Sequence, residues 1–270
     1  MRIEPASLAL SMLFFTELTQ SDWPLADGTV AILPLAAVEA HGPHLPLGTD
    51  QMIAEGIVDK AALALELMDR DRAAVMLPTL WLGASAEHGD KPGTLSQDPE
   101  QMAAQIVSVG ISLAQAGIDR LVLFSAHGGN RAAAEIASLR LRTEAGMLVA
   151  TPHWSNFGLP EGLNPPAPKA GDVHGGWQET SIMLALRPDL VQMDKAADFT
   201  GAPPASPLFP AGPIGWGWMT SDINETGAIG RADLGTPMLG AALLDYFGPQ
   251  LADLIVAMAD ADWNGEAVEP

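Results

Sequence analysis

Short apolar runs alternate along the chain with longer segments that carry apolar residues at helical spacing. The runs typical of buried strands are residues 29–35, 74–82, 120–125 and 147–151. The segments with helical spacing are residues 51–67, 98–116, 130–143, 178–186 and 237–258. This alternation predicts an α/β domain with a mostly parallel sheet and right-handed crossovers. In such folds the functional site lies beyond the carboxyl ends of the strands.

Capping residues set the expected ends of several helices. Asp50 and Asn130 each precede a helical segment, and both residue types are common N-caps because their side chains accept a backbone hydrogen bond. Pro99 suits the first turn of a helix, and Gly117 suits its C-terminal stop. We therefore expect helices to begin next to Asp50, Pro99 and Asn130.

Two segments fall outside this alternation. Residues 8–15 (LALSMLFF) are too few to span a bilayer, and we expect an N-terminal helix or arm packed on the body. Residues 201–217 are rich in Pro and Gly, which fits a lid or a subunit contact as well as a plain surface crossover. The sequence shows no repeat and no linker, so residues 1–270 are expected to form a single domain.

The composition removes several classes of function. The chain has 33 acidic and 13 basic side chains and a net charge of −20, which opposes binding to nucleic acid or to anionic membranes. It has no Cys, so disulfides, thiolate metal sites and a Cys nucleophile are excluded. Any bound metal must therefore be held by His and carboxylate groups. No targeting or membrane segment is evident, which predicts a cytoplasmic protein.

The first group of candidate functional residues follows the first predicted strand, in residues 39–50 (EAHGPHLPLGTD). Glu39 and His41 are two positions apart, so in extended backbone they point the same way. Asp50 opens the next helix and can turn back toward them. Two carboxylates and an imidazole suit Zn²⁺, Mn²⁺ or Fe²⁺. A polar loop with a capping aspartate is the alternative.

A second group, residues 125–130 (SAHGGN), directly follows the strand predicted over 120–125. His127 would lie at the mouth of the sheet, near the first group if the two strands are neighbours. Gly128 and Gly129 permit a tight turn or a close approach of backbone to a ligand. A purely structural histidine is the alternative.

A third group, residues 172–181 (DVHGGWQETS), leads into a helix. Glu179 lies on an apolar stretch that is expected to face the interior, where a carboxylate needs a partner such as a metal. An exposed first-turn glutamate stabilised by the helix dipole explains it equally well. His174 lies five residues earlier, across the turn.

With these motifs the chain resembles the creatininase (creatinine amidohydrolase) family from about residue 29 to the C-terminal helix. The most specific match runs from Leu33 and Pro34 through residues 39–50. Similar to later family motifs are residues 92–94 (PGT), 127–130 (HGGN), 174–181 and 227–230 (GAIG). The resemblance implies a three-layer α/β/α sandwich, commonly a homohexamer, that hydrolyses C–N amide bonds with two metal ions.

The resemblance also assigns ligands. It implies that Glu39 and His127 bind one divalent ion, that His41 binds the other, and that Asp50 bridges the two. Creatininase itself has a Glu ligand two residues after the equivalent of His127, where this chain has a glycine. We expect Glu179 to supply the missing carboxylate. The departure puts creatinine in doubt as the substrate, because relatives include deformylases of formamide-bearing pyrimidines and peptidases that mature a peptide-derived cofactor.

The resulting hypothesis is hydrolysis of a small cyclic or linear amide by a hydroxide that bridges two metal ions, since such ions lower the pKa of bound water to about 7. His174 is the expected proton shuttle to the leaving nitrogen. The backbone N–H groups of Gly128 and Gly129 would stabilise the oxyanion, and His88 and Trp154 would line the pocket.

Several roles and functions stay open. His44 is expected to order its loop rather than bind metal, and the role of His153 is undecided. The competing functions are a formamide deformylase or a peptidase of the same family, a one-metal hydrolase using Glu39, Asp50 and His127, and a non-catalytic binder of small molecules.

Overall fold

A parallel sheet forms the centre of the computed structural model, which describes residues 13–167, 171–202, 204, 208, 210 and 214–265. Its five strands lie in the order β1-β3-β2-β4-β5, and every neighbouring pair is parallel. The strands are β1 (Leu13–Phe14), β2 (Val30–Leu35), β3 (Ala74–Met76), β4 (Arg120–Ser125) and β5 (Leu148–Ala150).

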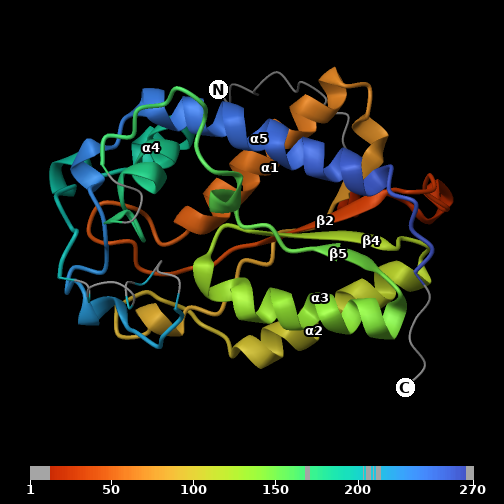
Figure 1. The fold of residues 1–270 in the computed structure, drawn as a ribbon, viewed down its shortest axis with the longest axis horizontal. Coiled ribbons are helices and arrows are strands. Elements are labelled where there is room, and N and C mark those ends of the chain that lie inside the picture. Colours follow the sequence, from red (N-terminus) through yellow and green to blue (C-terminus); the bar gives the residue numbers. More distant parts are fainter. Residues whose placement is uncertain are drawn as a thin grey trace, which may run out of the picture.

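Helices cover both faces of this sheet (Figure 1). On one face lie α1 (Thr49–Leu67), α4 (Trp177–Leu186) and α5 (Pro237–Ala259). On the other face lie α2 (Pro99–Gln115) and α3 (Arg131–Ala145). The expected three-layer α/β/α sandwich with a parallel sheet is therefore confirmed.

The central strands are apolar along their whole length because each face of the sheet packs on its own helical layer. In β2, Val30 and Ile32 belong to the hydrophobic cluster under α1 and α5. Ala31, Leu33 and Leu35 belong to the cluster under α2 and α3. Successive side chains point to opposite faces, so one strand contributes to both cores.

The expected cap at Asp50 is wrong. Helix α1 begins at Thr49 with Gly48 at the N-cap position, so Asp50 lies inside the first turn. Its carboxylate contacts His41 instead of the helix backbone. The same residue type serves as a cap or as a ligand, and only the tertiary structure distinguishes the two.

Asn130 does hold the N-cap position of α3, but its side chain makes no capping bond. It instead donates to the carbonyl of Ala36 and accepts from the amide of Ala84. Asn130 thereby ties together the chain after β2, the chain after β4 and the segment at Ala84. The expected boundaries at Pro99 and Gly117 are confirmed, since α2 begins at Pro99 and Gly117 has φ +90° just beyond it.

Two strands and the N-terminal segment differ from expectation. Strand β3 covers only three of the residues 74–82, because Pro78 has no N–H to extend the ladder. Strand β5 is likewise shorter than residues 147–151. Leu13–Phe14 forms edge strand β1 rather than a helix, whereas residues 8–12 lie outside the described part. Much of the segment 201–217 also lies outside it, so its role as a lid or contact stays a prediction.

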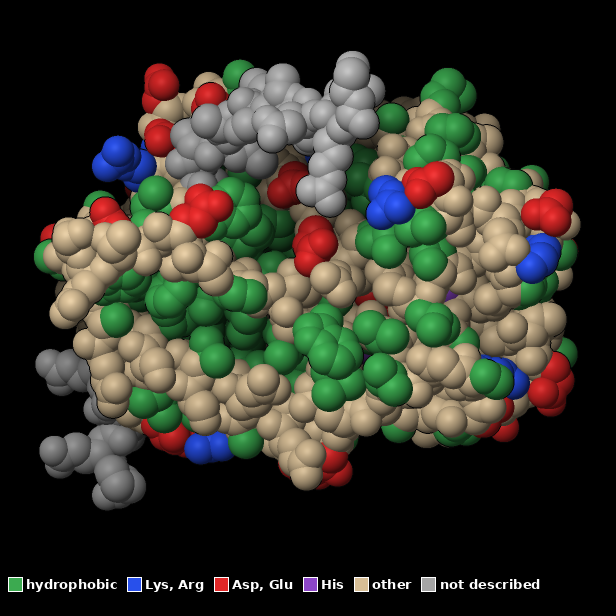
Figure 2. All heavy atoms as spheres, turned by 180° about the vertical axis from the view of Figure 1, so that it is seen from behind, with side chains coloured by type: hydrophobic (Ala, Val, Ile, Leu, Met, Phe, Trp, Pro, Cys, Tyr) green, Lys and Arg blue, Asp and Glu red, His purple; other side chains and the backbone are tan. Residues whose placement is uncertain are grey.

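Among the described residues, helix α5 alone is long and apolar enough to cross a membrane by length and composition. Its buried face, with Leu243, Phe247 and Leu251, packs in the cluster beneath α1 and α4. A role as a core helix accounts for this composition. On the face of the molecule that Figure 2 shows, acidic side chains are scattered rather than gathered in one patch.

The contact between α4 and α5 leaves no room for a side chain at Gly240. A Cβ atom there would overlap the carbonyl oxygen of Ser181 in α4. We predict that Gly240→Ala lowers the free energy of unfolding by about 1–3 kcal/mol, because the methyl group forces the two helices apart. This loss should exceed the gain of about 1 kcal/mol in helix propensity.

Gly56→Ala is the matched control, since a Cβ atom at that position meets only the flexible side chain of Leu186. Denaturant unfolding of the two variants checks the prediction. Equal stabilities for the two variants would show that the α4–α5 contact relaxes freely.

Candidate metal centre

The candidate site forms at the carboxyl edge of the sheet, where β2 and β4 end side by side. The last residues of the two strands, Leu35 and Ser125, are paired. Glu39 and His127 follow these ends by four and two residues, so the parallel register brings them together. The first turn of α1 adds Asp50, and the first turn of α4 adds Glu179.

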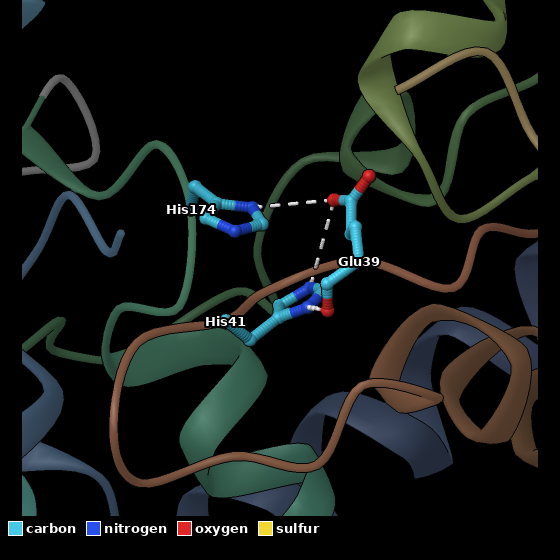
Figure 3. A group of neighbouring side chains, drawn as sticks. All are labelled: Glu39, His41 and His174. Atoms are coloured by element: carbon cyan, nitrogen blue, oxygen red, sulfur yellow. Dashed lines mark hydrogen bonds and ion pairs between the residues drawn. The ribbon is translucent and has the colours of Figure 1, made fainter. Parts of the chain in front are cut away.

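One carboxylate oxygen lies at the centre of the site. Glu39 is fully buried, and its Oε1 atom faces four imidazole rings. Figure 3 shows two of them, His41 and His174, with a dashed line from each ring to the carboxylate of Glu39. The distances from Oε1 are 3.1 Å to His127 Nδ1, 3.4 Å to His88 Nε2, 3.6 Å to His174 Nδ1 and 3.9 Å to His41 Nε2.

Asp50 lies between two of these rings. Its Oδ1 atom is 3.0 Å from His41 Nε2, and its Oδ2 atom is 3.4 Å from His127 Nδ1. Its two oxygens therefore face different imidazoles, as a bridging carboxylate requires.

Glu179 faces the interior. Its carboxylate is nearly buried, accepts a hydrogen bond from the amide of Gly175 at 2.6 Å, and lies 3.8 Å from His41 Nε2. The alternative of an exposed first-turn glutamate is therefore wrong. The contact with His41 brings Glu179 to the side of the cluster away from His127.

The donor set fits divalent cations. Both oxygens of Glu39 and Oδ2 of Asp50 are buried without a hydrogen-bond partner, and a buried carboxylate without a partner is costly unless a cation compensates it. Nitrogen and oxygen donors of this kind suit Zn²⁺, Mn²⁺ or Fe²⁺. Among the described residues, three groups each have donor atoms that all lie within 4.8 Å of one another. These groups are Glu39, Asp50 and His127; His41, Asp50 and Glu179; and Glu39, His41 and His174.

Burial and neighbouring opposite charges shift the pKa values of the site residues in opposite directions. Burial lowers the pKa of His41, but the carboxylates of Asp50, Glu179 and Glu39 together outweigh it and raise that pKa to about 10. Burial likewise acts on His127, and the charge of Glu39 raises its pKa to about 10. Burial raises the pKa of Glu39, yet His127 and the other imidazoles hold it well below its usual range. Without a cation, protons on His41 and His127 balance the buried carboxylates.

Burial also raises the pKa of Glu179 to about 7, although the charge of His41 opposes the shift. Its protonation state therefore changes near neutral pH.

His174 is held in one tautomer. Its Nε2 atom lies 2.8 Å from the carbonyl oxygen of Ala40. A carbonyl only accepts, so Nε2 carries the hydrogen and the lone pair of Nδ1 faces Glu39. Burial, and then the charge of His88, lowers the pKa of His174 well below its usual value. The ring can take up a proton at Nδ1, or it can bind a cation there together with Glu39 and His41.

His88 also reaches the cluster. Its Nε2 atom faces Glu39, its Nδ1 atom lies 2.6 Å from the hydroxyl oxygen of Thr220, and its ring lies 4.0 Å from that of His174 between centroids. Burial lowers its pKa to about 4. A neutral ring beside the candidate metal ligands is compatible with the predicted substrate contact.

Other predicted residues lie outside the cluster. His44 contacts the Thr180 hydroxyl at 2.9 Å, and its carbonyl accepts from Gln192, which agrees with a loop-ordering role. Trp154 is buried in the hydrophobic core against Phe247, so its placement gives no support to a substrate contact. His153 bonds to Ser155 within a short 3₁₀ turn.

The Gly pair forms a tight turn, one of the two expected roles, since Gly128–Asn130 is a short 3₁₀ helix. A Cβ atom at Gly129 would overlap the carbonyl of Ala84 and lie 2.5 Å from His127 Nε2. The close approach that this glycine permits is therefore to the chain's own backbone, on the ring edge away from Nδ1. Stabilisation of an oxyanion by Gly128 and Gly129 stays a prediction.

Glu87 also reaches the site, although no sequence pattern pointed to it, and it lies 3.5 Å from His127 Nε2. Glu87 comes from a 3₁₀ turn, Ala86–His88, in a loop without periodic pattern. Its position next to His88 was the only signal in the sequence that could have found it.

Comparison with known proteins agrees with this geometry. The family model "Creatininase: Creatinine amidohydrolase" matches residues 16–255. The mycofactocin precursor peptide peptidase of Mycobacterium tuberculosis is 31% identical over 236 residues, which are 84% of this chain and 86% of the relative. The creatinine amidohydrolase of Pseudomonas putida is 29% identical over 263 residues, 90% and 95% of the two chains.

Solved structures give the same result. A structure described as "Creatininase Mn" superposes with a TM-score of 0.73 at 26% identity and covers 93% of this chain and 100% of that one. Another, of creatinine amidohydrolase (creatininase), has a TM-score of 0.72 at 25% identity, with 93% and 99% covered. The sheet order, the buried cluster and these relatives lead to one conclusion: the chain belongs to the creatininase (creatinine amidohydrolase) family of hydrolases.

Proposed function

We propose that the protein hydrolyses a C–N amide bond with two divalent cations. One cation would be held by Glu39, Asp50 and His127, and the other by His41, Asp50 and Glu179. The observation that carries the proposal is that these two donor groups share Asp50 and include buried carboxylate oxygens without partners. A shared carboxylate sets two cations side by side, as binuclear hydrolases require.

The chemistry divides between the cations and the chain. Two bound cations would polarise the substrate carbonyl and make a water molecule nucleophilic at neutral pH. His174 would take a proton from that water at Nδ1 and pass it to the leaving nitrogen. Its Nε2 already donates to the Ala40 carbonyl, which fixes the ring, and its low pKa keeps Nδ1 unprotonated at neutral pH.

The substrate class we favour is a peptide amide. The relatives above 30% identity, from three mycobacterial species, are named mycofactocin precursor peptide peptidases. The expected non-peptide or cyclic amide is the second candidate, which the creatinine amidohydrolase relative supports. Gly129, where creatininase has a glutamate ligand, argues against creatinine itself. The homohexamer, the cytoplasmic location, and the choice among Zn²⁺, Mn²⁺ and Fe²⁺ stay predictions.

A substrate panel tests this function. We predict that the protein loaded with Mn²⁺ or Zn²⁺ hydrolyses short peptides faster than creatinine, cyclic ureas or formamides, with release of an amine as the readout. Asp50→Asn should abolish hydrolysis because it removes the shared ligand charge, whereas Glu135→Gln on the exposed face of α3 should not. Full activity of Asp50→Asn, or no hydrolysis of any amide by protein that holds two cations, would contradict the proposal.

Binding of the cations should expel protons. His41 and His127 each have a pKa near 10, so both are protonated in the metal-free protein at pH 7. A cation binds only the deprotonated imidazole, and Glu179, with a pKa of about 7, must lose its remaining proton as well. Binding at pH 7 should therefore release about two to three protons, and the affinity should rise with pH up to about 10. Calorimetry in buffers with different heats of ionisation measures this number.

The same titration at pH 10.5 is the control, because there both rings are already mostly neutral and few protons should be released. A binding heat that does not depend on the buffer at pH 7 would disprove the charge balance described above.

A further inference from the structure

The ring of His127 faces different groups at its two nitrogens. Nδ1 points to Glu39 and Asp50, at 3.1 Å and 3.4 Å. Nε2 points the other way and lies 3.1 Å from the carbonyl oxygen of Ala84. A carbonyl only accepts, so the hydrogen of the neutral ring is on Nε2 and the lone pair of Nδ1 faces the carboxylates. The backbone alone therefore selects the tautomer that can bind a cation.

A second acceptor with a full charge lies on the same edge. Glu87 Oε1 is 3.5 Å from His127 Nε2, beside the Ala84 carbonyl and the Ser85 hydroxyl. The backbone of this turn is fixed from outside, since the hydroxyl of Thr220 donates to the Glu87 carbonyl at 3.1 Å. The Glu87 carboxylate is thereby aimed at the ring rather than at bulk solvent.

Gly129 makes this approach possible. A Cβ atom at position 129 would lie 2.5 Å from Glu87 Oε1 and 2.5 Å from His127 Nε2. Any other residue would occupy the space in which the carboxylate meets the ring. The absence of a side chain at Gly129 therefore leaves the space that the Glu87 carboxylate occupies beside the ring.

We propose that Glu87 is a positioning residue that orients His127 and strengthens it as a metal ligand. Its carboxylate shares the Nε2–H with the Ala84 carbonyl, fixes the plane of the ring, and increases the electron density at Nδ1. The proposal rests on the two-cation function above. Carboxylates that accept from the outer nitrogen of a ligating histidine typically contribute 10–100-fold to metal affinity.

The test measures metal affinity rather than activity. Mn²⁺ or Zn²⁺ is titrated against a chromophoric chelator, and Glu87→Gln keeps the shape of the side chain but removes its charge. One of the two binding steps should weaken by about 10–100-fold, and the other should change little. Glu135→Gln removes a charge on the exposed face of α3 and should leave both steps unchanged.

A double-mutant cycle separates positioning from direct ligation. Because Glu87 acts only through His127, Glu87→Gln should have no further effect on affinity in a His127→Ala background. A further loss in that background would mean that Glu87 binds the cation itself, and would overturn the proposal. Unchanged affinity of Glu87→Gln in the otherwise wild-type chain would also overturn it.

Nitrogen NMR of the histidine rings adds a measurement that does not need turnover. In the loaded protein, the His127 Nε2–H signal should shift in Glu87→Gln, whereas the His153 signals should stay unchanged. An unshifted His127 signal would overturn the proposal. If the wild-type chain binds two cations but cleaves no amide, only the proposed function fails, and the affinity test of Glu87 still applies.

Discussion

The burial of two carboxylates at the end of the sheet is the constraint on which the rest of the structure depends. Glu39 and Asp50 lie in the interior with three oxygens that have no hydrogen-bond partner. Such charges are tolerated only when something positive faces them. Four imidazoles surround Glu39, and Asp50 and Glu179 reach the same cluster from α1 and α4. Binding of cations explains this cluster better than a contribution to the stability of the fold does.

The fold brings these residues together from separate parts of the sequence. The paired ends of β2 and β4 bring Glu39 and His127 to one edge, and the N-terminal turns of α1 and α4 close it from the helical side. The Asn130 side chain joins these segments, because it donates to the Ala36 carbonyl and accepts from the Ala84 amide. The donors therefore lie just beyond strand ends and in the first turns of helices.

The sequence alone predicted the three layers of the fold and most of the residues in the cluster. Continuous apolar runs predict buried parallel strands, and a His or Glu directly after such a run falls at the edge of the sheet, as Glu39 and His127 do. Local patterns also pointed to Asp50, at the start of the next helix, and to Glu179, on an apolar helical stretch. The resemblance added which of these residues would share a cation.

Local patterns left several positions undecided. A capping aspartate and a ligating aspartate look alike in sequence, so Asp50 was misplaced within α1. Trp154 has both an apolar body and a polar edge, and its packing against Phe247 gives the predicted substrate contact no support. Glu87 lies in an irregular turn whose path is set by long-range contacts such as that of Thr220. Loops of this kind have no periodicity from which their direction could be inferred.

The central claim is that two cations share Asp50, and diffraction at the metal absorption edge tests it most directly. Crystals of the protein loaded with Zn²⁺ or Mn²⁺ should give two anomalous peaks, one bounded by Glu39, Asp50 and His127 and the other by His41, Asp50 and Glu179. A single peak, or a second peak bound by His174 with Glu179 left unligated, would contradict the account.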